Sequence, residues 1–167
     1  MAEPSAEEKA FRKREGTVAP NMQLALTNAP NVAMRHLELI RAATAGMPPR
    51  QKELMILLVG LLTDNDYCWG HHVPLALDAG LSITQIRSLR AGDHSVFPPD
   101  EQALLAYCAA VIKQRVTDEL WEAVRLGRTS EDLVKITMVV GYYCMVGLAR
   151  GALDVAQDDG FGGFEVP

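Results

Sequence analysis

The chain has 167 residues, 49% of them hydrophobic and 22% charged, with a formal net charge of −5. This length and apolar fraction suffice for one hydrophobic core and exclude a low-complexity disordered chain. The 16 basic and 21 acidic residues leave no cationic surface for a nucleic acid, and no purely apolar stretch is as long as a membrane span.

The N-terminal residues and the cysteines indicate the cellular compartment of the protein. Residues 1–15 mix acidic and basic side chains and lack the apolar segment of a secretory signal. Cys68, Cys108 and Cys144 are an odd number without a paired spacing, which argues against a disulfide framework. We therefore expect a cytoplasmic protein in which Cys108 and Cys144, inside apolar runs, are core residues.

We expect three parts along the chain: a polar N-terminal arm over 1–16, one all-α domain over 17–157, and a Gly-rich tail over 158–167. The domain shows helical spacing of apolar residues and no convincing strand alternation. It begins with a short apolar segment over 21–28. A helix is predicted over 31–45, with a glycine as its stop.

Two prolines open the next predicted helix, whose body over 54–62 is apolar on every side. A helix of this kind must be buried all round, and for so small a chain we expect subunit contacts to bury it. The next helix is expected over 66–79, ended by Gly80, with Pro74 inside it. Later helices are predicted over 82–90, from Asp100 as the N-cap to about 114, over 117–126 and over 130–153.

The densest group of reactive side chains lies at the start of the helix over 66–79. Cys68 and His72 are four residues apart and share one helix face, and His71 flanks it. A thiol in the first turn meets the positive helix end, and this lowers its pKa, whereas burial raises it. The sequence does not decide between these two effects.

Glu53, at the start of the preceding apolar helix, is a candidate proton carrier. Burial raises the pKa of an unpaired carboxylate. Each candidate also has a structural interpretation: Glu53 as a surface residue at a helix N-terminus, Cys68 as a packed thiol, His71 as a solvated side chain and His72 as a hydrogen-bonded core residue. Adjacent histidines point about 100° apart on a helix, so we expect no metal site.

The segment PPRQKELMILLVGLLT, followed by DNDYCWGHHVPLALDAGLS, resembles the carboxymuconolactone decarboxylase superfamily, which also contains the alkylhydroperoxidase-D-like proteins. The core resemblance covers residues 48–92, and a weaker one covers 100–155. It implies an all-α helical bundle that assembles into homo-oligomers, trimers or hexamers, with a pocket for a small molecule near the subunit contacts.

The peroxidase branch of that superfamily has a glutamate before a Cys-x-x-Cys-x-x-x-His motif. The resemblance matches the glutamate to Glu53, the second cysteine to Cys68 and the histidine to His72, but Asn65 stands where the first cysteine belongs. A dithiol cycle within the motif therefore cannot run. The decarboxylase-like branch often has glutamate at the position of Cys68, so this chain, which retains Trp69 and His72, matches neither branch fully.

Three functions remain open. The first is a cofactor-free acid–base lyase or decarboxylase for a small carboxylated or lactone-like molecule, with Glu53 and His72 exchanging protons and Cys68 in the pocket wall. The second is a one-Cys peroxidase using Cys68, with an external thiol, Cys108 or Cys144 as the resolving partner. The third is a non-catalytic oligomeric binding protein. Residues expected to contact the bound molecule are Tyr67, Trp69, His71 and Asn65, with Arg50 or Arg150 for a carboxylate.

Overall fold

The computed structural model describes residues 20–158, so the expected arm over 1–16 and all of the expected tail except Asp158 lie outside the described residues. Over the described range every regular element is a helix, and the predicted all-α class is confirmed. The helices are α2 (Asn21–Leu26), α3 (Pro30–Thr44), α4 (Pro49–Leu62), α5 (Asp66–Asp78), α6 (Ile83–Arg90), α7 (Pro99–Ile112), α8 (Asp118–Arg125) and α9 (Ser130–Ala152).

Local signals place the helix ends close to the predicted positions. Gly46 and Gly80 follow α3 and α5 with φ values of 74° and 90°, a conformation that glycine adopts without strain. Ser82 begins α6 with a reciprocal capping box to Gln85. The N-cap of α7 is a proline, Pro98, so the prediction of Asp100 as the cap was wrong. Asp100 lies in the first turn, where its negative charge interacts favourably with the helix dipole.

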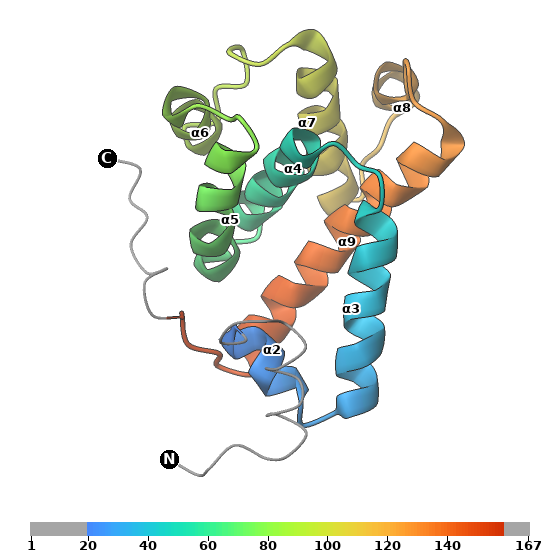
Figure 1. Cartoon of the computed structure of the whole chain (residues 1–167). Coiled ribbons are helices and arrows are strands. Elements are labelled where there is room, and N and C mark those ends of the chain that lie inside the picture. Colours follow the sequence, from blue (N-terminus) through green and yellow to red (C-terminus); the bar gives the residue numbers. More distant parts are fainter. Residues whose placement is uncertain (1–19, 159–167) are drawn as a thin grey trace.

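The apolar helix α4 lies at the centre of the bundle, packed against α5, α7 and α9 (Figure 1). Residues 54–59 are at most 2% exposed in a single chain. The expectation that subunit contacts bury this helix was therefore wrong, because helices of the same chain already cover every side. Glu53 enters this core with the first turns of α4.

A smaller apolar cluster joins α2 to the bundle below the main core. Met22 of α2 is buried together with Tyr67 of α5 and with Tyr142 and Val146 of α9. In Figure 1, α2 lies beside the end of the long helix α9, whose start packs near α7 and α8. By length and composition alone α9 could cross a membrane, a test that core helices of soluble proteins also pass.

Candidate functional site

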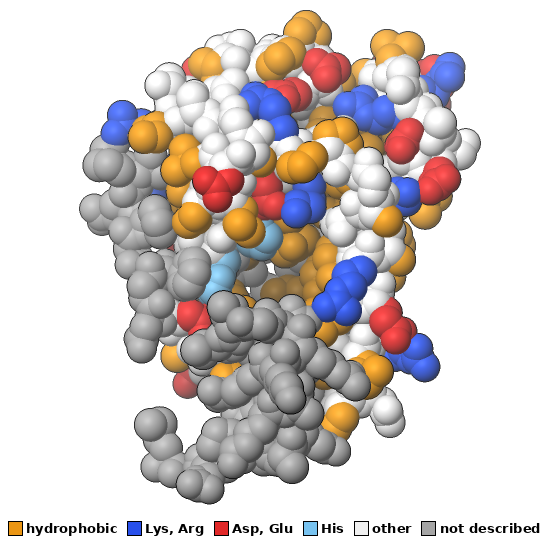
Figure 2. Space-filling view, in the orientation of Figure 1, with side chains coloured by type: hydrophobic (Ala, Val, Ile, Leu, Met, Phe, Trp, Pro, Cys, Tyr) orange, Lys and Arg blue, Asp and Glu red, His pale blue; other side chains and the backbone are white. Residues whose placement is uncertain are grey.

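A cavity of about 230 Å³ opens between α2, α3, α5 and α9. Figure 2 shows histidine side chains gathered at a hollow on this face of the molecule, with hydrophobic side chains around it. Its wall is formed by apolar side chains, three tyrosines, three histidines and one thiol. The lining residues are Pro20, Met22, Gln23, His36, Leu37, Ile40, Tyr67, Cys68, His71, His72, Leu75, Tyr142, Tyr143 and Val146.

His72, which lines this cavity, forms a close pair with the buried carboxylate of Glu53. The Nδ1 atom of His72 lies 2.6 Å from Oε2 of Glu53, whose side chain is 3% exposed. Lys52 contacts the other carboxylate oxygen at 2.9 Å, so both oxygens of Glu53 have a cationic or hydrogen-bonding partner. Helix α4 supplies the carboxylate and α5 the imidazole, and the packing of these two helices brings the pair together.

The electrostatics of Glu53 follow from this pairing. Burial by itself raises the pKa of the Glu53 carboxyl, but the hydrogen bonds and positive charges of His72 and Lys52 outweigh it and leave the pKa below its ordinary value. Glu53 is therefore ionised at neutral pH. An ionised carboxylate on Nδ1 fixes the tautomer and the orientation of the imidazole.

Cys68 lies in the first turn of α5, with its backbone N–H donated to the N-cap side chain of Asn65 at 3.1 Å. Its side chain is packed in the core, and Sγ lies 3.9 Å from the carbonyl oxygen of Ile56. Burial raises the pKa of the Cys68 thiol strongly, and the negative charge of Glu53 raises it further. The effect of burial thus exceeds that of the helix terminus, and the thiol is protonated at neutral pH.

We expect alkylation of Cys68 by iodoacetamide to have a midpoint well above the free-thiol pKa of about 8.5. The pH dependence is measured peptide by peptide with mass spectrometry, so that Cys144, which is more exposed, serves as an internal control for the reagent. A midpoint below pH 8 that disappears in His72→Ala would instead show a thiolate activated by the imidazole.

Two of the residues predicted to contact a bound molecule lie outside the cavity wall. Asn65 is buried beneath α9, where a Cβ built on Gly147 would lie 3.0 Å from its Nδ2 atom, and Nδ2 has no hydrogen-bond partner among the described residues. Trp69 packs in the main core, with the guanidinium of Arg90 5.6 Å from its ring centre. Both residues therefore shape the helix that carries Cys68 rather than the cavity itself.

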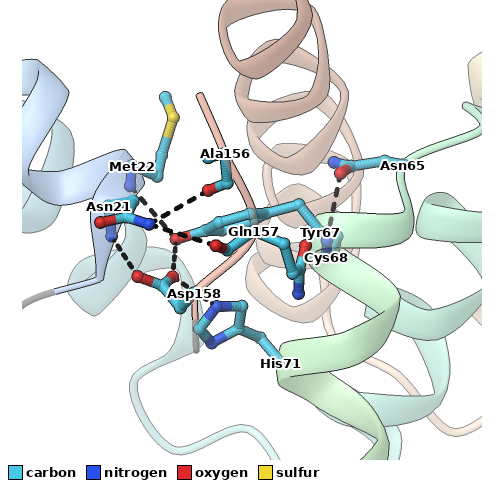
Figure 3. Close-up of polar contacts among 9 residues, drawn as sticks. All are labelled: Asn21, Met22, Asn65, Tyr67, Cys68, His71, Ala156, Gln157 and Asp158. Carbon is cyan, nitrogen blue, oxygen red and sulfur yellow. Dashed lines mark hydrogen bonds and ion pairs between the residues drawn. The ribbon is translucent and has the colours of Figure 1, made fainter. Parts of the chain in front are cut away.

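The other two predicted contact residues, Tyr67 and His71, do line the cavity. They meet at the carboxylate of Asp158, which also holds the start of α2 (Figure 3). Asp158, which was expected in the tail, and His36 are not among the predicted site residues. The hydroxyl of Tyr142 lies 2.7 Å from Nε2 of His36 across a separation of 106 residues, a pairing for which no sequence spacing is a signal.

The arginines proposed for a substrate carboxylate lie elsewhere. Arg50 makes two contacts of 2.7 and 3.0 Å with Glu101 and a third of 2.6 Å with the carbonyl oxygen of Gly80. Arg50 thus ties α4 to α7 and to the turn after α5. Arg150 does not line the cavity either. Over residues 20–158, no cluster of three or more His, Cys, Asp and Glu side chains could hold a metal ion.

Comparisons with known proteins agree with this architecture. The family model described as the carboxymuconolactone decarboxylase family matches residues 29–110. No curated protein matches the chain. The solved structures that resemble it include a protein of unknown function from Agrobacterium tumefaciens with a suggested role as the antioxidant defence protein AhpD. The two are 24% identical, with a TM-score of 0.68, over 78% of this chain and 91% of that one.

Two further structures have the same fold. One is an alkylhydroperoxidase AhpD core, an uncharacterised peroxidase-related protein from Ralstonia eutropha JMP134, with 18% identity and a TM-score of 0.77 over 92% of this chain and 84% of that one. The other is a variant of the debrominase Bmp8 in complex with 2,3,4-tribromopyrrole, with 16% identity and a TM-score of 0.75 over 90% and 83%. The family match over residues 29–110 and the shared fold confirm the predicted resemblance to the carboxymuconolactone decarboxylase and alkylhydroperoxidase-D-like superfamily.

Proposed function

We propose that this protein is a cofactor-free acid–base enzyme of the lyase or decarboxylase type, in which His72 exchanges a proton with a small molecule in the cavity. The observation that carries the proposal is the 2.6 Å contact between Nδ1 of His72 and the buried, ionised carboxylate of Glu53. Because Nδ1 is engaged, Nε2 is the ring nitrogen that can meet a molecule in the cavity.

The state of the thiol favours this chemistry over a one-Cys peroxidase. Attack on a peroxide requires a thiolate, and the raised pKa of Cys68 leaves very little of it at neutral pH. A neutral thiol beside His72 is a polar part of the wall.

In a decarboxylation the bond between the carboxyl carbon and its neighbour breaks, carbon dioxide leaves, and the electron pair passes to the neighbouring carbon and its conjugated carbonyl. The protonated His72 then delivers a proton to that carbon, and Glu53 stabilises the imidazolium before transfer. The largely apolar wall strengthens these charge interactions relative to bulk water. A small ring fits a cavity of about 230 Å³.

The first test is a substrate screen with the whole protein at neutral pH. The panel contains small lactone acids and β-keto acids. Release of carbon dioxide and the organic product are followed for wild type and Cys68→Ser. Turnover that persists in Cys68→Ser supports acid–base chemistry. Peroxide consumption with sulfenic acid at Cys68, and no turnover of the panel, would support the peroxidase instead.

We also propose that the protein is a homo-oligomer that uses the exposed face of α9. Val134, Met138, Met145 and Leu148 recur at spacings of four, seven and three residues and are exposed, Leu148 by 77%. Such an apolar stripe is typical of a helix that packs against another subunit. We expect Leu148→Glu to lower the mass measured by sedimentation, whereas Leu126→Glu, at a loop position 72% exposed, leaves it unchanged. Equal masses for wild type and Leu148→Glu would contradict this.

A further inference from the structure

The carboxylate of Asp158 connects α2 and α5, two helices of the cavity wall, although Asp158 does not itself line the cavity. Its Oδ2 atom lies 2.5 Å from the hydroxyl of Tyr67 and 2.8 Å from Nε2 of His71, and its Oδ1 atom accepts the backbone N–H of Asn21 at 2.7 Å. The side chain is 15% exposed. Figure 3 shows these groups converging on Asp158 from α2 and from α5.

The residues that Asp158 holds belong to the cavity wall. Tyr67 and His71 line the cavity from α5, and their rings lie 4.5 Å apart. Met22 and Gln23, which follow Asn21 in α2, line it from the side of α2. One carboxylate therefore fixes two walls of the same cavity relative to each other.

The start of α2 depends on the carboxylate of Asp158 for its hydrogen bonds. The first backbone N–H groups of a helix have no partner within it. That of Asn21 is donated to Asp158, and that of Met22 is donated to the hydroxyl of Tyr67 at 3.1 Å. The side-chain amide of Asn21 also donates to the carbonyl oxygens of Ala156 and Gln157. A helix of six residues is too short to be stable alone, so tertiary contacts must hold it in place.

We propose that Asp158 is a positioning residue that holds Tyr67 and His71 in the cavity wall and fastens α2 across it, and thereby limits the access of small molecules to Cys68 and His72. This inference goes beyond the proposed acid–base function, because access to the cavity does not depend on which reaction takes place there. The geometry requires a carboxylate, since both oxygens accept hydrogen bonds at the same time.

The first experiment measures hydrogen exchange of the Asn21 and Met22 amides by NMR. Both amides should be protected in wild type, since both are hydrogen-bonded. Asp158→Ala should make them exchange at least about tenfold faster, because Asn21 loses its acceptor and the Tyr67 hydroxyl that accepts from Met22 loses its own partner. Asp158→Glu restores a carboxylate and should recover most of the protection. The matched control is Asp154→Asn, four residues before Asp158 in the turn that follows α9, which should leave both amides unchanged.

The second experiment uses iodoacetamide as a probe of access to the cavity. Asp158→Ala should raise the alkylation rate of Cys68 at least about tenfold at fixed pH, quantified on the Cys68 peptide alone, whereas Asp154→Asn leaves it unchanged. The proposal is overturned if the Asn21 and Met22 amides stay protected in Asp158→Ala, if the amides of α4 accelerate equally, or if Cys68 reacts no faster. None of these outcomes would affect the acid–base proposal, which rests on Glu53 and His72.

Discussion

Replacement of His72 by alanine should lower kcat on a substrate found in the screen by about 10²–10⁴-fold, the range over which a positioned general acid or base acts. Glu53→Gln should also lower kcat, because an amide at the same place cannot stabilise the imidazolium or hold the same tautomer as firmly. The double variant should be no slower than His72→Ala alone, since Glu53 acts through His72.

His94→Ala is the matched control for this series, because His94 lies in the turn before α7 and does not line the cavity. Its kcat should equal that of wild type. If His72→Ala and His94→Ala turn over the substrate equally fast, His72 takes no part in proton transfer. If the effects of Glu53→Gln and His72→Ala multiply in the double variant, the two side chains act independently and the pair is not one catalytic unit.

Replacement of Glu53 by alanine should lower the free energy of unfolding by about 2–3 kcal/mol, because hydrogen bonds of a buried charged group are lost and His72 and Lys52 are left without their shared partner. Urea unfolding followed by circular dichroism measures this loss. Glu131→Ala is the control, since Glu131 pairs with Lys135 on the surface and its side chain is 74% exposed. A surface pair of this kind contributes less than about 1 kcal/mol.

The same carboxylate makes stability depend on pH in a defined direction. The pKa of Glu53 is lower in the folded state than its ordinary value, so the unfolded state binds the proton first as the pH falls. The stabilisation by Glu53 is fully present above its unfolded pKa of about 4.3 and is lost as the pH falls through its folded pKa. Wild type should therefore lose stability in acid more steeply than Glu53→Gln. If stability falls equally steeply with pH in the two proteins, the pairing with His72 and Lys52 does not lower the pKa of the Glu53 carboxyl.

The sequence predicted the helices well because their limits depend on local signals. Gly80 ends α5 where a left-handed residue is needed, and Pro49 begins α4 where no N–H is lost. The burial of α4 was predicted, but not what covers it. The apolar pattern of a helix reports how much of its surface is covered and does not report whether the cover comes from the same chain.

The site was predictable where spacing and resemblance coincide, as for Cys68 and His72 on one face of α5. The pairing of Glu53 with His72 came from the resemblance alone, since the spacing of 19 residues between them carries no geometric signal. Asp158 and His36 could not have been found in this way, because they reach the cavity only through tertiary folding. The protonation state of the Cys68 thiol depends on its burial, which cannot be read from a sequence pattern.

The position of α4 also bears on the order of events when the protein is made. Residues 54–59 of this helix are covered on all sides by other helices of the same chain, so a newly synthesised subunit can complete its core before it meets another copy. Its neighbour α5 follows directly in sequence, and contacts between adjacent helices form quickly. Assembly through α9 would then be a later, concentration-dependent step, and dilution would separate subunits that remain folded.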